Sequence, residues 1–130
     1  MNSPITGKEM TLCQETRTAK YRGESFAYTA HYYRCEESGE RFTTKSSDTE
    51  DMEQVYRQYR QRHNMPSPIE IRSIRMKYGI SASRMSRILG LGANQYRLYE
   101  SGEMPSLSNA RLIQLVAIEE NFKSLSELYR

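Results

Sequence analysis

Apolar and aromatic side chains alternate with polar ones in the first third of the chain. Within residues 25–35, one set of alternating positions holds Phe26, Tyr28, Ala30 and Tyr32, and the other holds Ala27, Thr29, His31 and Tyr33. A period of two that is dense in aromatic rings predicts a strand with one packed face. Residues 9–21 and 40–44 are predicted to be its neighbours, because turn-forming residues separate the three segments. Three strands alone are marginally stable, so another element should cover one face of this small antiparallel sheet.

The segment after the predicted sheet changes to a polar pattern. Residues 45–51 have no apolar anchor, and we expect them to be exposed. They lead into a predicted helix over residues 50–63, capped by Ser47, Asp48 or Thr49. The apolar residues of this helix gather on one narrow face, which holds Val55, Tyr56 and Tyr59. A face this narrow is typical of a connecting helix rather than a core one, and Pro66 marks where it has ended.

After Pro66 the apolar positions follow helical spacing, and capping residues separate the helices. The first helix is predicted to open with a capping box formed by Ser67 and Glu70 around Pro68, and to end before Gly79. Further helices are predicted over residues 81–89, 94–100, 107–120 and 125–129, the last two capped by Ser106 or Ser108 and by Ser124. The apolar face of the fourth helix is predicted to hold Leu112, Leu115, Val116 and Ile118.

These patterns predict an α+β protein built from three parts. Residues 1–46 form a small β-rich domain, residues 47–66 a linker helix, and residues 67–130 an all-α domain of five short helices. A length of 130 residues is enough for two very small domains of this kind.

Composition and cysteine usage favour a soluble protein. No apolar run reaches the roughly 20 residues of a membrane span, and no signal-peptide pattern opens the chain. We therefore expect a cytoplasmic protein without a membrane partner. The two cysteines, Cys13 and Cys35, are too few for a disulfide framework and should remain thiols in a reducing compartment.

Charge is distributed unevenly between the two halves. Residues 1–64 carry ten Lys or Arg against ten Asp or Glu, whereas residues 65–130 carry nine against six. Residues 71–99 contain no acid, and their basic residues are Arg72, Arg75, Lys77, Arg84, Arg87 and Arg97. A basic block of this kind indicates a nucleic-acid surface; the alternative is a solvated helix face.

The helices predicted over residues 81–89 and 94–100 are joined by a turn that contains glycine. Two helices joined in this way present the second helix to the major groove of DNA. The side chains expected to face inward are Ile80, Met85, Ile88, Leu89, Leu91, Tyr96 and Tyr99. The exposed positions of the second helix then include three predicted base readers, Asn94, Gln95 and Arg97, because amides pair with adenine and arginine with guanine. Phosphate contacts are predicted for Ser83, Arg84 and Arg87. The alternative is a generic helical bundle.

The segment from Ile80 to Ser106 resembles a helix-turn-helix of the Xre/Cro type. More closely, the stretch Gly90-Leu91-Gly92-Ala93-Asn94, followed by Tyr99-Glu100-Ser101-Gly102, is similar to the carboxy-terminal domain of the MqsA (YgiT) antitoxins of bacterial toxin–antitoxin systems. In that family, the asparagine after the glycines and an arginine four residues later read operator bases, and the resemblance implies the same roles for the corresponding positions here. The asparagine corresponds to Asn94. The arginine position holds Leu98 here, with Arg97 beside it.

The resemblance extends to the amino-terminal half, where the cysteines differ. The family's amino-terminal domain is a zinc-bound sheet held by two Cys-x-x-Cys pairs, and it is the toxin-binding region. The corresponding residues here are Ser3-Pro4-Ile5-Thr6 and Tyr32-Tyr33-Arg34-Cys35, so only Cys35 remains at a ligand position. A structural zinc site needs four Cys or His ligands. We therefore predict no metal and no other cofactor, with tyrosine packing in place of zinc.

Nothing in the pattern predicts catalysis. His31 and His63 lack a sequence-local partner set, and a Cys13–His31 thiol–imidazole pair is less expected than a small core cysteine. Gly90-Leu91-Gly92 is a turn between helices and follows no strand, so it is not a phosphate-binding loop. We expect a regulator rather than an enzyme.

The function predicted from the sequence is that of a DNA-binding transcriptional regulator. It would be a homodimer on a palindromic operator, would repress its own operon, and would bind a toxin through its amino-terminal domain. Two alternatives stay open. One is a stand-alone repressor without a toxin; the other is a protein-interaction adaptor that has lost DNA binding, which Leu98 at a reader position favours.

Overall fold

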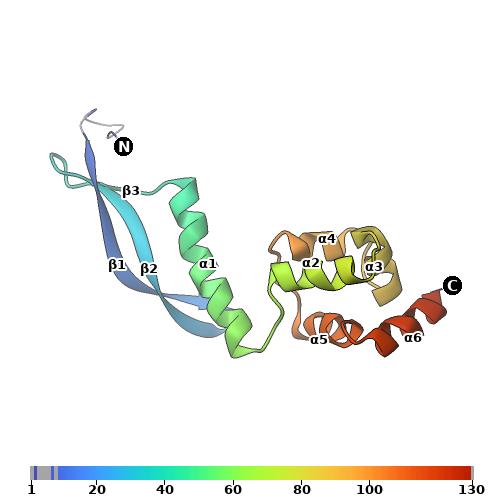
Figure 1. Ribbon diagram of the computed structural model, residues 1–130. Helices are drawn as coiled ribbons and strands as arrows, with labels where there is room; N and C mark the ends of the chain where they lie inside the picture. Colours follow the sequence, from blue (N-terminus) through green and yellow to red (C-terminus); the bar gives the residue numbers. More distant parts are fainter. Residues whose placement is uncertain (1, 3–6, 8, 130) are drawn as a thin grey trace. The chain divides into compact units, whose positions relative to one another are not determined.

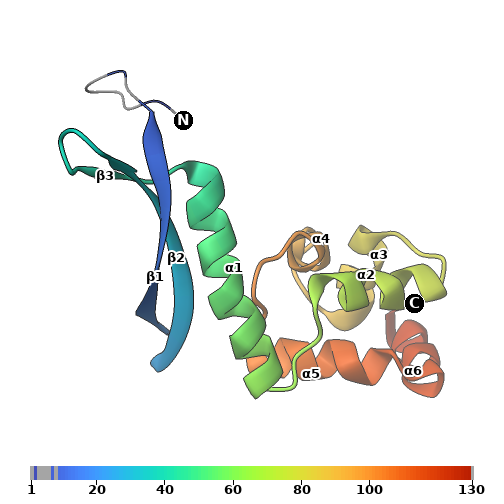
Figure 2. The same ribbon diagram turned by 60° about the vertical axis from the view of Figure 1, so that its left-hand side comes forward.

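A computed structural model describes residues 2, 7 and 9–129 and divides the chain into two compact units, residues 1–59 and 60–130. The first unit holds a sheet of three strands and most of one helix, and the second holds five further helices (Figures 1 and 2). The predicted α+β class is confirmed. None of the described helices is long and apolar enough to cross a membrane.

The sheet is an antiparallel meander in the order β1-β2-β3. Strands β1 (Met10–Tyr21) and β2 (Glu24–Cys35) pair over their whole length, while β3 (Arg41–Phe42) adds two residues to the end of β2. The turn between β1 and β2 has positive φ at both central residues, Arg22 (51°) and Gly23 (80°). A turn of this kind matches the right-handed twist of the strands it joins. The predicted strands and the turn between them are confirmed.

One face of β2 is packed, as its alternating pattern predicts. Phe26, Ala30 and Tyr32 are buried, and Tyr28 is half-buried. The rings of this face meet helix α1 (Lys45–Arg62), which buries Val55 and Tyr59. Ring centroids of Phe26 and Tyr59 lie 6.1 Å apart in an edge-to-face arrangement. Because Tyr21 also packs against two tyrosines of α1, aromatic contacts supply much of this small core.

Helix α1 begins earlier than the sequence predicts. Thr44 and Ser47 form reciprocal bonds of 3.1 Å, each backbone N–H donating to the other residue's hydroxyl. This pair satisfies backbone donors at the start of the helix. Ser47, Asp48 and Thr49 therefore lie inside α1 rather than capping it. Residues 45, 46 and 48–50 are exposed as predicted, whereas Ser47 is half-buried and Asp51 is buried. The first turn carries no apolar residue, so hydrophobic periodicity could not reveal it.

The polar side chains of α1 cover the free edge of β2. They bond the backbone of alternate strand residues, which are Ala27, Thr29 and His31. Gln54 both donates to the Thr29 carbonyl (2.8 Å) and accepts from the Thr29 N–H (2.9 Å). Gln58 donates to the Ala27 carbonyl, and the Asp51 carboxylate accepts from the His31 N–H. The interpretation of α1 as merely a connecting helix is wrong, because its glutamines serve as edge partners that strands otherwise lack.

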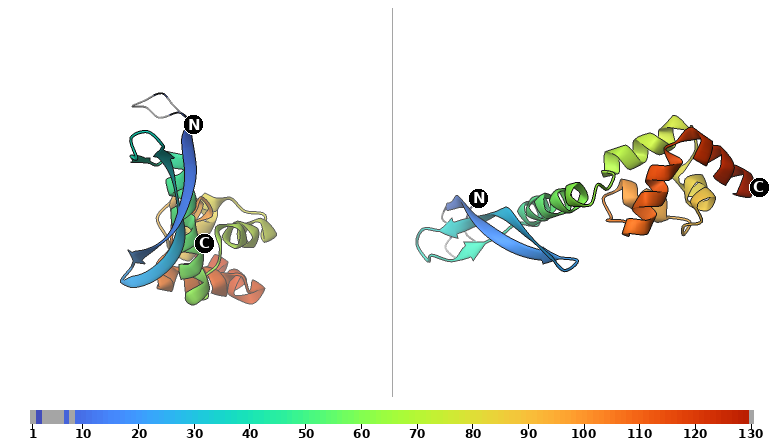
Figure 3. Two further views of the ribbon diagram at one scale, coloured as in Figure 1. Left: turned by 90° about the vertical axis from the view of Figure 1, so that its left-hand side faces the viewer. Right: turned by 90° about the horizontal axis from the view of Figure 1, so that it is seen from below.

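The second unit surrounds one apolar core. Its helices are α2 (Pro68–Lys77), α3 (Ala82–Leu89), α4 (Gln95–Glu100), α5 (Leu107–Val116) and α6 (Glu119–Tyr129). The buried cluster consists of Ile71, Met85, Leu89, Tyr96, Tyr99, Ile113 and Val116. The predicted capping box of Ser67 and Glu70 at the start of α2 is confirmed. Figure 3 shows α5 and α6 adjoining along the chain.

The last two helices differ from the sequence prediction. Helix α5 ends at Val116, and α6 begins at Glu119, well before the predicted start at residue 125. Ser124 is an interior residue of α6, whose hydroxyl donates to the carbonyl of Glu120. The predicted apolar face of α5 is partly wrong too. Leu115 and Ile118 are each 54% exposed, whereas Ala110, Ile113 and Val116 are buried. Apolar residues lie on both sides of this helix, so spacing alone did not determine which side is buried.

Candidate nucleic-acid interface

Helices α3 and α4 are joined by a tightly defined turn. The hydroxyl of Ser81 accepts the N–H of Arg84 and caps the start of α3. The helix ends at Gly90, whose φ of 74° is left-handed, and the N–H of Leu91 donates to the carbonyl of Ser86 at 2.8 Å. This is a Schellman ending, which favours glycine because other residues are strained at such a φ.

The inner side of α4 is fixed by buried hydrogen bonds. The hydroxyl of Ser86, on α3, accepts the N–H of Tyr96 at 2.9 Å. The Tyr96 ring is completely buried, and its hydroxyl donates to the carbonyl of Ile71, on α2. Burial raises the pKa of Tyr96, so the phenol stays neutral and keeps its proton for this bond. Both neighbouring helices thus hold the first turn of α4 in place.

The far end of α4 is held by an ion pair. Arg75, on α2, donates two bonds of 2.8 Å to the carboxylate of Glu100, and a third to the carbonyl of Ile80. Its hydrogen bond with Glu100 raises the pKa of Arg75, which secures the charge of the guanidinium. Tyr99 accepts a bond from Asn109 on α5. Since a two-pronged pair fixes orientation as well as distance, α4 is positioned along its whole length.

The outer side of α4 exposes the residues that the sequence predicts as readers. Asn94 occupies the N-cap position, yet its side chain makes no cap hydrogen bond and is exposed. Arg97 follows three residues later and Leu98 four residues later, so both lie on the same face as Asn94. Arg97 is exposed, and Leu98 is 39% exposed. The structure therefore brings Asn94 and Arg97 together on one exposed face.

Gln95 has a different environment from the other two. Its side chain is half-buried, and its amide donates to the Glu103 carboxylate at 3.0 Å. Glu103 lies in the loop after α4, and its own N–H donates to the Leu98 carbonyl. An amide engaged in this way would have to give up a charge-assisted bond before it could contact a base.

The residues predicted to contact phosphate lie exposed on α3. Ser83 and Arg87 are four residues apart and therefore share a face. The guanidinium carbon of Arg84 lies 5.5 Å from the ring centroid of Tyr129, on α6. This stacking limits the directions in which Arg84 can point. Sequence reasoning missed Tyr129, as it also missed the Arg75–Glu100 pair, because nothing local signals a contact between residues so far apart.

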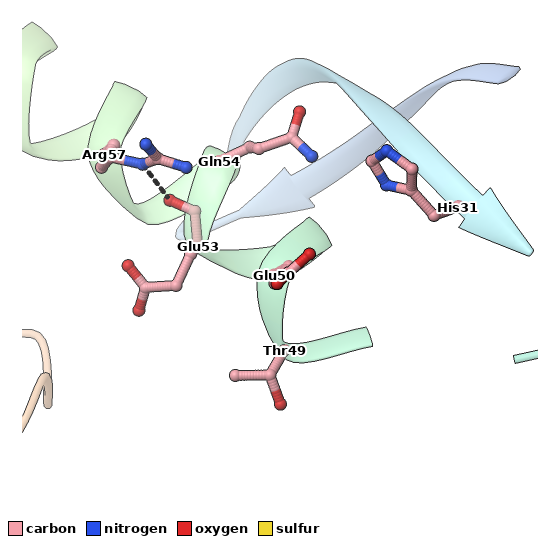
Figure 4. Close-up of a pocket in the computed structure, with 6 residues that line it drawn as sticks. All are labelled: His31, Thr49, Glu50, Glu53, Gln54 and Arg57. Atoms are coloured by element: carbon pink, nitrogen blue, oxygen red, sulfur yellow. Dashed lines mark hydrogen bonds between the residues drawn. The ribbon is translucent and has the colours of Figure 1, made fainter. Parts of the chain in front are cut away.

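A surface cleft of about 610 Å³ lies in the first unit, where α1 runs beside β2. Figure 4 shows that His31 comes from the strand and that the other lining residues come from the helix: Thr49, Glu50, Glu53, Gln54 and Arg57. The Nδ1 atom of His31 lies 2.7 Å from the Asp51 carboxylate. Cys13 is opposite Tyr32 in the ladder, whereas His31 is opposite Gln14. Neighbouring strand positions point to opposite faces, so Cys13 and His31 do not form a thiol–imidazole pair.

A model of the MqsA family, the antitoxin component of bacterial toxin–antitoxin systems, matches residues 1–128. The chain belongs to this antitoxin family. The membership predicted from the resemblance is confirmed, and the match extends over both units. No curated protein matches the chain.

The zinc that the MqsA resemblance implies does not fit the residues of this chain. Cys35 is completely buried and faces Met10 across the ladder. Among the residues that the structure describes, no three His, Cys, Asp or Glu side chains gather as a metal site would require. The other positions of the family's ligand pairs, Ser3 and Thr6, lie outside the described residues.

Proposed function

We propose that this MqsA-family antitoxin binds operator DNA through the exposed face of α4 and represses its own operon. The observation that carries the proposal is the state of Asn94: it stands at the start of a rigidly held helix, and its amide is exposed and not used as a cap. In most helices an asparagine at this position caps the backbone. An amide free of that task can pair with an adenine edge, and Arg97 on the same face can pair with guanine.

The surrounding surface supports a role in DNA binding. Ser83, Arg84 and Arg87 are exposed on α3, and we propose that they contact phosphates and fix the orientation of α4. Residues 71–99 contain no acid that would repel the phosphates. Gln95 is proposed as a further reader that releases Glu103 on binding.

We propose further that the antitoxin binds its operator as a homodimer. One short helix reads only a few base pairs, so two-fold symmetry on a palindromic site doubles the contact. The second unit leaves large apolar side chains exposed on α5, on α6 and between them: Leu115, Ile118 and Leu128. Exposed apolar side chains such as these could be covered by a second copy of the chain.

Toxin binding is proposed for the first unit. Members of the matched family are antitoxins, and the readers proposed above occupy the second unit, which leaves the sheet and α1 for a protein partner. A toxic protein encoded next to this one, co-purifying with it, would support this role. A functional operator site with no such neighbour would favour a stand-alone repressor.

A gel-shift of the full chain on the DNA upstream of its own gene, at two salt concentrations, tests the proposal. We expect a shift that survives non-specific competitor DNA and weakens as salt rises, because phosphate contacts release counterions. Absence of any specific shift by folded protein would overturn the DNA-binding role. In that case the exposed Leu98 would point to a protein-interaction adaptor.

A further inference from the structure

The two edges of the β1–β2 hairpin differ in whether their backbone groups are covered. The edge of β2 is covered along its length, because α1 bonds its backbone at Ala27, Thr29 and His31 and β3 pairs with its end. The edge of β1 is the outer edge of the sheet, and no strand or helix of the described chain pairs with it (Figure 1). An unpaired edge of this length readily accepts another strand.

The backbone groups on the open edge belong to alternate residues of β1. The odd-numbered residues of β2, such as Thr29 and His31, direct their backbone groups away from β1 and toward α1. The even-numbered residues of β2 therefore direct theirs toward β1, where they face the odd-numbered residues 11–19. The outward N–H and C=O groups of β1 are therefore those of Leu12, Gln14, Thr16, Thr18 and Lys20. All five residues are exposed, and none is a proline. The edge thus offers donors and acceptors over nine consecutive residues.

We propose that this edge pairs with the same edge of a second copy of the chain, antiparallel and centred on Thr16. In this register Thr16 faces its own copy and Gln14 faces Thr18, while Leu12 faces Lys20. All the facing residues carry outward backbone groups, so about ten hydrogen bonds can form. Two hairpins would become one four-stranded sheet of full-length strands.

Charge complementarity selects the second copy and the register. On the face that α1 packs against, Glu15 and Arg17 stand side by side on β1 and bond one another. Centring the pair on Thr16 places Glu15 of each copy opposite Arg17 of the other, so four charges alternate in sign. Shifting the centre by one residue either way opposes two Glu15 or two Arg17 side chains, which is unfavourable. A strand from an unrelated protein would not have this self-complementarity.

The pairing goes beyond the proposed operator dimer and does not depend on DNA. A closed dimer has one two-fold axis. If both the sheet edges and the second units pair within one dimer, both interfaces therefore lie on that same axis. The prediction concerns the full chain free of DNA, and its failure would leave the gel-shift result unaffected.

Disulfide trapping of the full chain tests the proposal. In a Cys13→Ser background, which leaves Cys35 buried, Thr16→Cys places the new thiol opposite its own copy, within disulfide reach. Thr18→Cys is the matched control, because it lies on the same edge and face but opposes Gln14. We expect Thr16→Cys to give covalent dimers at least about ten-fold faster than Thr18→Cys under mild oxidation.

A second change separates pairing from chance collision. Thr18→Pro removes an outward N–H but no bond within the hairpin, so the hairpin should tolerate it. Added to Thr16→Cys, it should reduce dimer formation to the rate of the control. Equal rates for Thr16→Cys and Thr18→Cys, or trapping that Thr18→Pro leaves unchanged, would overturn the proposal. So would a co-purified protein whose strand occupies the edge and leaves the chain monomeric.

Discussion

The two units of this antitoxin are stabilised in different ways. In the second unit, five helices surround a continuous apolar cluster that includes Ile71, Met85, Tyr96 and Ile113. In the first unit, a single helix covers the sheet. Polar side chains of this helix, such as Asp51 and Gln54, attach it to the sheet by hydrogen bonds to the backbone of β2. The second unit can therefore change its surface without loss of its core, whereas in the first unit Gln54 both covers the strand edge and lines the surface cleft.

This difference bears on how each unit evolves. The proposed base readers Asn94 and Arg97 are exposed and lie outside the core cluster, so substitutions there should cost little stability. The first unit belongs to a family whose sheet, by resemblance, is held by zinc, yet here Cys35 packs as an ordinary buried side chain. Contacts between α1 and β2 stabilise the sheet in this chain.

The largest effect is expected in the apolar core. Ile113→Ala removes a completely buried side chain of α5 and should lower the free energy of unfolding of the second unit by about 2–5 kcal/mol. Leu107→Ala, in the first turn of the same helix and 46% exposed, should change it by less than about 0.5 kcal/mol. Chemical denaturation followed by circular dichroism measures both. Similar losses in the two variants would show that the core is placed wrongly.

Among the polar contacts of the first unit, those of Asp51 should contribute most to stability. Asp51→Ala leaves the N–H of His31 without its acceptor, and it should cost about 1.5–3 kcal/mol. Asp48→Ala, at an exposed position of the same helix, serves as the control. Amide exchange at His31 and Thr29 reports the effect locally. Unchanged protection of both amides in Asp51→Ala would contradict the role assigned to α1.

A smaller loss is expected where α3 holds α4. Ser86→Ala removes the buried hydroxyl that accepts the Tyr96 N–H and should cost about 1–2 kcal/mol. Ser83→Ala, exposed on the same helix, should leave stability unchanged. Thermal melts of the two variants, compared side by side, would reveal whether this bond matters.

The smallest expected effect is on the stability of the first unit at low pH. The Arg17 guanidinium holds the pKa of Glu15 below its ordinary value of 4.5. A carboxyl with a lowered pKa stabilises the fold above its unfolded pKa, and this contribution is lost as the pH falls through the folded pKa. The Glu15 side chain is 34% exposed, so water screens the pair and the loss should be slight. Glu15→Gln should flatten this part of the stability–pH curve below pH 4.5, and an unchanged curve would argue against the pair.

The sequence predicted those parts of the fold that local chemistry determines. The alternation around Phe26 and Tyr32, the capping box at Ser67 and the glycine ending of α3 each depend on residues close together in the chain, and each is confirmed. The start of α1 was wrong because its cap, Thr44, precedes a turn without apolar residues. The end of α5 was wrong because apolar residues continue past Val116.

The candidate site was predictable in its residues but not in their surroundings. Local spacing placed Asn94 and Arg97 on one face of α4. It could not show that Glu103 engages Gln95, or that Arg84 stacks on Tyr129, because these contacts bring together residues from separate segments. The bonds from α1 to the edge of β2 were missed for the same reason, because glutamine side chains on a helix usually face solvent rather than a strand backbone.

The most direct test of the central claim is to measure operator affinity for the wild type, Asn94→Ala and Arg87→Ala, on the operator, on single-base variants of it and on unrelated DNA. Asn94→Ala should lose about 1–3 kcal/mol on the operator, and its discrimination should relax at one base pair per half-site. Arg87→Ala should weaken binding to all sequences alike and lower the salt slope by about 1. An Asn94→Ala protein that binds and discriminates like the wild type would contradict the assignment of α4 as the reading helix.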